Sequence, residues 1–136
     1  MTYVALYVVT MIVFLGVDAL WLKYVMNPLF QAHIGDLMAP ELRLWVAGLF
    51  YLFYIAGIIY FAQLPGLRSG SMQLVLINGA ILGFLAYGTY EATNMATLRG
   101  WSWSMVAVDV AWGTFLTAMS AWVGLTVVKA LGLAGN

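Results

Sequence analysis

The chain has 136 residues, of which 65% are hydrophobic and only 7% are charged, and its five basic and five acidic side chains cancel. A soluble globular domain carries about 25% charged residues, so we expect most of this chain's surface to face lipid. The chain has no run of basic residues, which argues against nucleic acid as a partner. It also has no cysteine, which excludes disulfides and thiolate metal sites.

Four apolar segments are each close to or above the ~20 residues that cross a bilayer as a helix. The first segment lacks the basic region and the cleavage site of a signal peptide, so we interpret it as a retained helix. None of the segments shows the alternation of a β-barrel strand. The sequence therefore predicts an all-α integral membrane four-helix bundle, a single domain of residues 1–136. Its helices are expected at about Tyr3–Val25, Leu42–Gln63, Met72–Leu98 and Trp103–Lys129.

The longest connection, residues 26–41, separates the first two predicted helices. The Asn27-Pro28 pair is expected to stop the first helix, and Pro40 is expected to lie near the start of the second. Between them, regularly spaced apolar residues predict a short helix that lies at the membrane interface. These residues are Leu29, Phe30, Ile34 and Leu37.

The other connections, residues 64–71 and 99–102, have the composition of plain turns, so neighbouring helices are expected to run antiparallel. We call the side that holds the N-terminus side X and the opposite side Y. Three basic residues fall on side Y and two on side X, which favours Y as the cytoplasmic side. A belt of interfacial tryptophans is expected near side Y, made of Trp21, Trp45, Trp101 and Trp103.

The third apolar segment carries an unusual group of polar side chains. Tyr87, Tyr90, Glu91 and Asn94 stand at positions i, i+3, i+4 and i+7, so they are predicted to share one helix face. An acid flanked by two phenols and an amide does not belong against lipid. An ionisable residue inside the bilayer indicates a functional site.

Asp18 and Asp109, on the first and fourth helices, are predicted to lie at the same depth as Glu91, roughly 10 Å below side Y. Tyr51 and Tyr54 of the second helix come only slightly deeper. Three carboxylates at one level cannot all be ionised cheaply, so a proton or a cation is expected to neutralise them. The alternative is that each acid only bonds a neighbouring side chain and fixes the packing.

Trp21 follows Asp18 by one helical turn, and Trp112 follows Asp109 in the same way. Both are candidates for contact with a bound molecule. The only histidine, His33, falls in the first connection and is expected to be solvated, or else to relay protons near side Y. One histidine is too few for haem or a di-iron centre. Carboxylate and amide oxygens would suit a hard cation, but no ligand spacing defines a metal site.

Four motifs in order resemble a family of bacterial predicted membrane proteins called domain of unknown function 2177. They are D-x-x-W-L from Asp18, F-Y-x-x-Y-x-x-G from Phe50, Y-x-x-Y-x-x-T-N from Tyr87 and D-x-x-W-G from Asp109. The residue before x-T-N in that family is usually Asp, whereas this chain has Glu91. The resemblance covers almost the whole chain and implies a multi-pass protein of the bacterial inner membrane with four spans. It also implies an association with membrane-lipid modification, but no established activity.

Three functions remain open at this stage. The first is binding or modifying a lipid or other apolar molecule, or assisting an enzyme that does. Glu91, Asp109 or Asp18 would then act as general acid or base. The second is a small transporter coupled to protons or cations and working as a dimer, in which Asp18 exchanges protons. The third is a non-catalytic subunit or assembly factor of a larger membrane complex. The first two would use the substrate-binding candidates Tyr51, Tyr54, Tyr87, Tyr90, Asn94, Trp21 and Trp112.

Overall fold

The structure, a computed structural model, describes residues 1–38 and 43–134. Within these residues, four helices are long and apolar enough to cross a membrane, which confirms the predicted all-helical, four-span architecture. They are Thr2–Ile34, Trp45–Ser69, Met72–Thr97 and Trp103–Ala130. The part of the chain that is described contains no β-strand.

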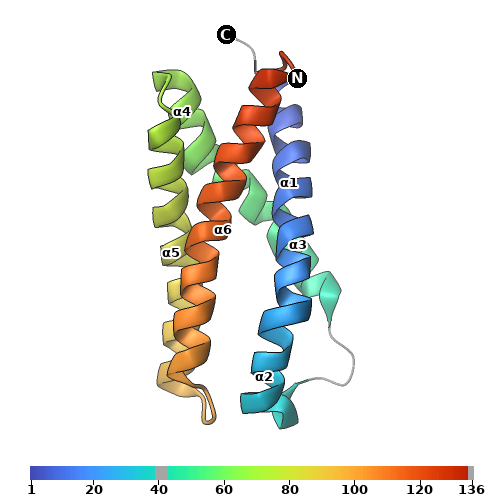
Figure 1. The fold of residues 1–136 in the computed structure, drawn as a ribbon, viewed down its shortest axis with the longest axis vertical. Coiled ribbons are helices and arrows are strands. Elements are labelled where there is room, and N and C mark those ends of the chain that lie inside the picture. The colour runs from blue at the N-terminus through green and yellow to red at the C-terminus, as the bar shows by residue number, and fades with distance from the viewer. Residues whose placement is uncertain (39–42, 135–136) are drawn as a thin grey trace.

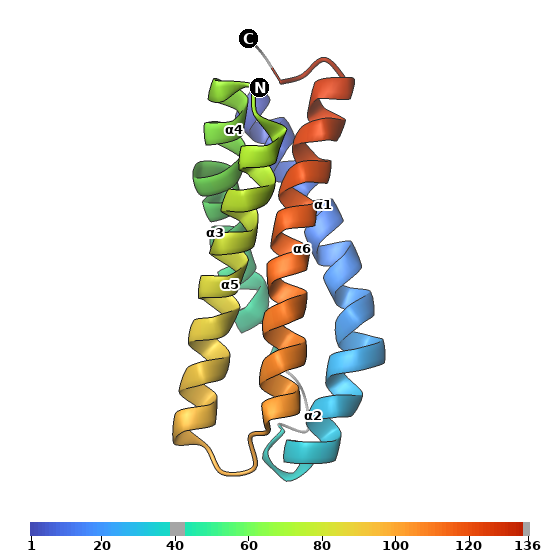
Figure 2. The ribbon, with the colours of Figure 1, turned by 60° about the vertical axis from the view of Figure 1, so that its left-hand side comes forward.

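Helix α6 (Trp103–Ala130) lies at the centre of the bundle, with α5 (Met72–Thr97) on one side and α1 (Thr2–Trp21) on the other (Figure 1). Helix α3 (Leu44–Ile58) crosses behind them, from beside α1 towards α5 (Figure 1). The start of α1 and the end of α6 lie at the same end of the bundle, as an even number of spans requires (Figure 2). The first, second and third spans therefore all pack against α6.

The first span does not stop at Asn27-Pro28, so that prediction was wrong. Helix α1 continues through a π-helical turn, Leu22–Met26, into α2 (Asn27–Ile34), and Pro28 stands in the first turn of α2. The wider π turn lets a proline enter a continuous helix, because it rearranges the hydrogen bonds that the missing N–H would disrupt. The predicted interfacial helix is thus a direct extension of the first span. The predicted start of the second helix at Pro40 and Leu42 lies outside the described residues.

The second span repeats this device. A π turn, Ile59–Gln63, leads into α4 (Leu64–Ser69) with Pro65 in its first turn. The predicted helix end at Gln63 was therefore wrong, and the connection to α5 is only Gly70 and Ser71. Pro65 cannot donate to the carbonyl of Phe61, four residues earlier. That oxygen instead accepts a hydrogen bond of 3.0 Å from Asn78 Nδ2 on α5.

Helices α5 and α6 match their predicted bounds within one residue. Each starts with a serine whose hydroxyl accepts from a first-turn amide, Ser71 from Leu74 and Ser102 from Met105. Small residues let the two backbones approach closely. A side chain at Gly83 would overlap the Gly113 carbonyl oxygen, and one at Gly113 would overlap the Tyr87 ring. This close contact fixes the axial position of α5 relative to α6.

Candidate functional site

Asp18 links three helices in the side-Y half of the bundle. Its carboxylate accepts a hydrogen bond of 3.0 Å from the indole Nε1 of Trp112 on α6 and another of 3.1 Å from the hydroxyl of Tyr51 on α3. Only 3% of the Asp18 surface is exposed. An acid so deeply buried is tolerable because both of its oxygens have a donor. The two aspartate–tryptophan motifs therefore meet in space through a contact between the first acid and the second tryptophan.

Aromatic rings enclose this aspartate. The indoles of Trp21 and Trp112 are stacked, with centroids 4.1 Å apart and planes within 3° of parallel. Phe14 packs against both Tyr51 and Tyr54 at 5.6 Å. The Nε1 of Trp21 is buried and has no partner among the described residues. Aromatic rings therefore pack around Asp18, and the indole N–H of Trp21, one helical turn away, has no acceptor among the described residues.

Towards the bundle centre, the hydroxyls of Tyr54 and Thr117 lie 2.9 Å apart in a buried hydrogen bond between α3 and α6. The Tyr87 ring packs on the edge of Tyr54 at 6.4 Å and over Gly113. Its hydroxyl is buried, with no partner among the described residues. The third span thus adds a second buried phenol to this polar region, beside Tyr54.

Glu91 and Asp109 form a second acidic centre, between α5 and α6. Glu91 has no exposed surface, and its Oε1 accepts 2.9 Å from Nε1 of Trp101. Its other oxygen has no donor among the described residues, and Asp109 on α6 is a close neighbour of this glutamate. Two ionised carboxylates cannot donate to each other. A hydrogen bond within this pair therefore requires one proton held between the two groups, and a cation could take its place.

The predicted single polar face of α5 is only partly correct. Tyr87 and Glu91 point into the bundle, but 51% of Tyr90 is exposed and its ring packs on the edge of Trp101. Asn94 is half-buried near the end of the helix. Relative to Tyr87, Tyr90 is rotated by about −60° around the helix and Glu91 by about +40°. These two side chains therefore diverge by about 100°, enough to expose Tyr90 while Glu91 stays between α5 and α6.

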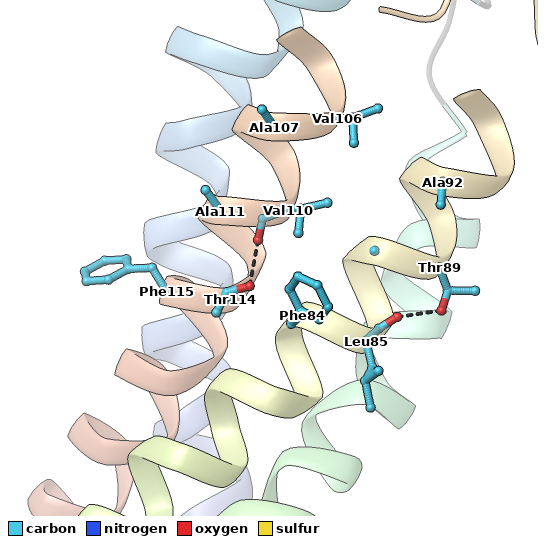
Figure 3. Close-up of a pocket in the computed structure, with 11 residues that line it drawn as sticks. Phe84, Leu85, Thr89, Ala92, Val106, Ala107, Val110, Ala111, Thr114 and Phe115 are labelled. Carbon is cyan, nitrogen blue, oxygen red and sulfur yellow. Dashed lines mark hydrogen bonds between the residues drawn. The ribbon is translucent and has the colours of Figure 1, made fainter. Parts of the chain in front are cut away.

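A groove of about 880 Å³ lies between α5 and α6. Phe84 stands between the two helices, and Val106 and Val110 point from α6 towards α5 (Figure 3). The two threonines that line the groove turn their hydroxyls away from it. Thr89 donates to the Leu85 carbonyl oxygen, and Thr114 donates to the Val110 carbonyl oxygen. The groove is therefore an apolar surface. Its α5 wall includes Gly88 and Ala92, the neighbours in sequence of Tyr87 and Glu91.

Two parts of the site were missed or misassigned from sequence. Trp101 was assigned to the interfacial belt, yet it is buried and bonded to Glu91, so that assignment was wrong. Trp45 and Trp103, by contrast, are 73% and 72% exposed, as a belt requires. Thr117 was passed over because membrane threonines usually bond their own helix. The 2.9 Å contact with Tyr54 is not visible without the helix rotations.

His33 lies on α2, exposed, with Nδ1 2.9 Å from the Leu29 carbonyl oxygen of the same helix. It lies in the short helix predicted within this connection and is exposed, as expected of a solvated residue. Among the described residues, no three acidic or histidine side chains come close enough together to hold a metal ion. The site thus consists of Asp18 within its aromatic cage and the Glu91–Asp109 pair.

Four apolar spanning helices with acids buried between them define a multi-pass helical membrane protein. The chain belongs to a family described as predicted membrane protein (DUF2177), whose profile matches residues 3–126. This match confirms the family resemblance inferred from the motifs. Comparisons with curated proteins and with solved structures find no match.

Proposed function

We propose that the chain binds a membrane lipid or another apolar molecule in the groove between α5 and α6, with the Glu91–Asp109 pair as its polar end. It would modify that molecule or assist an enzyme that does. The observation that carries the proposal is the position of the groove. Its walls are neighbours in sequence of the acid pair, Ala92 next to Glu91 and Val110 next to Asp109. An apolar chain in the groove would therefore lie within one helix diameter of a proton donor.

The chemistry of the pair suits proton transfer. A carboxyl group that shares a proton with a second carboxylate can both donate and accept, which is what general acid–base catalysis requires. Trp101 fixes one oxygen of Glu91, and the second oxygen has no partner among the described residues. Glu91 and Asp109 are the proposed acid and base, and Asp18, held by two donors, has a positioning role. The proposed location is the bacterial inner membrane, with lipid as the partner.

Native mass spectrometry of the protein released from its own membranes tests this function. We expect a reproducible bound lipid or apolar molecule, which is lost in Asp109→Asn and when Ala111→Phe fills the groove. Asp36→Asn, an exposed acid outside the acid pair, and Ala56→Phe, on the exposed surface of α3, are the matched controls. A protein that never carries a bound molecule, with folding intact, would exclude this proposal.

A second candidate function is proton- or cation-coupled transport by a dimer, which the Glu91–Asp109 pair also favours because such a pair exchanges a proton for a cation. Reconstituted vesicles distinguish it. A cation flux linked to protons and abolished by Asp109→Asn would favour transport over lipid chemistry. The same native spectra report whether the protein is a monomer, a dimer or part of a larger complex.

A further inference from the structure

A second polar cluster lies in the side-X half of the bundle, away from the acids. Thr10 on α1, Gln63 at the end of the second π turn and Ser120 on α6 have no exposed surface. Ser120 is eleven residues beyond Asp109 on the same helix, a distance of roughly 16 Å at 1.5 Å per residue. This cluster is therefore separate from the acidic site.

The orientation of the Gln63 amide is determined by its partners. Nε2 donates a hydrogen bond of 2.7 Å to Thr10 Oγ1 and another of 3.1 Å to the carbonyl oxygen of Ala121. A backbone carbonyl can only accept, so the nitrogen must face Ala121 and the amide oxygen must face elsewhere. A side chain at Gly124 would overlap Thr10 and Gln63, so glycine at this position makes room for the amide.

Two buried atoms of the cluster have no partner among the described residues, the amide oxygen Oε1 of Gln63 and the hydroxyl of Ser120. Nearby Thr114 shows the usual solution, because its hydroxyl donates 2.8 Å to a carbonyl of its own helix. Ser120 makes no such bond. Ser120 stands one helical turn before Gly124, the position that Thr10 and Gln63 abut, so both unpaired atoms lie on the same face of α6. An unpaired polar group is costly in the membrane interior, so both atoms favour a further hydrogen-bond partner.

We propose that Thr10, Gln63 and Ser120 enclose a buried water molecule that bridges Gln63 Oε1 and the Ser120 hydroxyl. Water fits both needs, because it donates to an amide oxygen and exchanges a hydrogen bond with a hydroxyl. The cluster contains no carboxylate, and the amide nitrogen of Gln63 occupies the same layer, so a metal cation is a poorer match. The site adds a polar level in the half of the bundle opposite the acids, and it does not depend on the proposed lipid function.

Water-edited solid-state NMR of the wild-type protein in lipid bilayers tests the site directly. The chain has three glutamines, Gln31, Gln63 and Gln73, so a Gln63→Met variant assigns the signal. We expect magnetisation to reach the Gln63 and Ser120 side chains from water. Thr117, whose hydroxyl is satisfied by Tyr54, serves as the internal dry control. Transfer to Gln63 and Ser120 no faster than to Thr117 would overturn the proposal.

The sign of one stability change gives an independent test. If water bridges the cluster, Ser120→Ala removes a hydrogen bond and should lower the folded-to-unfolded ratio about three- to tenfold. If the site is dry, the same change removes an unsatisfied hydroxyl and should raise the ratio. Ser104→Ala, an exposed serine on the same helix, is the matched control and should leave the ratio unchanged. A raised ratio for Ser120→Ala would contradict a bound water.

Discussion

Trp112 donates its indole hydrogen to Asp18 across 94 positions of sequence and so joins the fourth span to the first. The same aspartate accepts from Tyr51 of the second span. Three of the four spans are thus linked through one buried carboxylate. The stacked ring of Trp21 covers the Trp112 indole and holds it in this orientation.

We predict that Asp18→Ala and Trp112→Phe each destabilise the protein and that their effects are coupled. The interaction free energy should be about 0.5–2 kcal/mol, the range for hydrogen bonds between membrane helices. Unfolding of the single and double variants in mixed micelles measures it. Trp103→Phe, a ring that is 72% exposed, is the control and should have little effect. Strict additivity of the two changes would show that the bond contributes nothing.

The seam between α5 and α6 should not tolerate a side chain at Gly113. Gly113→Ala places a methyl group into the Tyr87 ring and should cost about 1–3 kcal/mol, as overpacked cores do. Gly48→Ala on α3 meets nothing within 4 Å. That control should be neutral or gain up to about 1 kcal/mol from helix propensity. Thermal unfolding of the two variants compares them, and equal effects would contradict the close contact.

Asn78 is expected to stabilise the second span, because Pro65 has no N–H to donate to the Phe61 carbonyl oxygen. Asn78→Leu leaves the Phe61 carbonyl without its side-chain donor and should destabilise the protein by about 1–3 kcal/mol. Pro65→Ala restores a backbone N–H in the same turn, so the loss should be smaller in that background. A double-mutant cycle by unfolding measures this rescue. An identical loss in both backgrounds would separate Asn78 from the proline.

The acid pair predicts an unusual response at position 91. Glu91→Gln keeps an oxygen for Trp101 and places an amide donor beside the Asp109 carboxyl, so stability should be kept or improved. Glu91→Ala removes both partners and should cost about 1–3 kcal/mol. Comparing the two variants by unfolding checks the arrangement. If Gln is as harmful as Ala, the two carboxyls do not share a hydrogen bond.

The class of the protein follows from its amino-acid sequence alone. Composition and segment length predicted four spans, because only helices satisfy backbone groups in lipid and a helix needs about 20 apolar residues to cross. Motif order also identified the family, and the structure confirmed the bounds of α5 and α6 within one residue. The positions of Asp18, Glu91 and Asp109 within apolar segments also indicated that these side chains point into the bundle. The reason is that a charged side chain facing lipid is costly.

Which side chains meet depends on how the helices are arranged in three dimensions. Each acid's partner depends on the rotation and crossing of whole helices, which spacing along one helix does not contain. Trp101 illustrates this, because its position next to a turn suggested the membrane interface, yet the fold directs its indole to Glu91. The continuation of two spans through Pro28 and Pro65 also depended on context. A π turn precedes each proline and rearranges the backbone hydrogen bonds around it. At Pro65, Asn78 from another helix also donates to the Phe61 carbonyl oxygen, which the proline cannot reach as a donor.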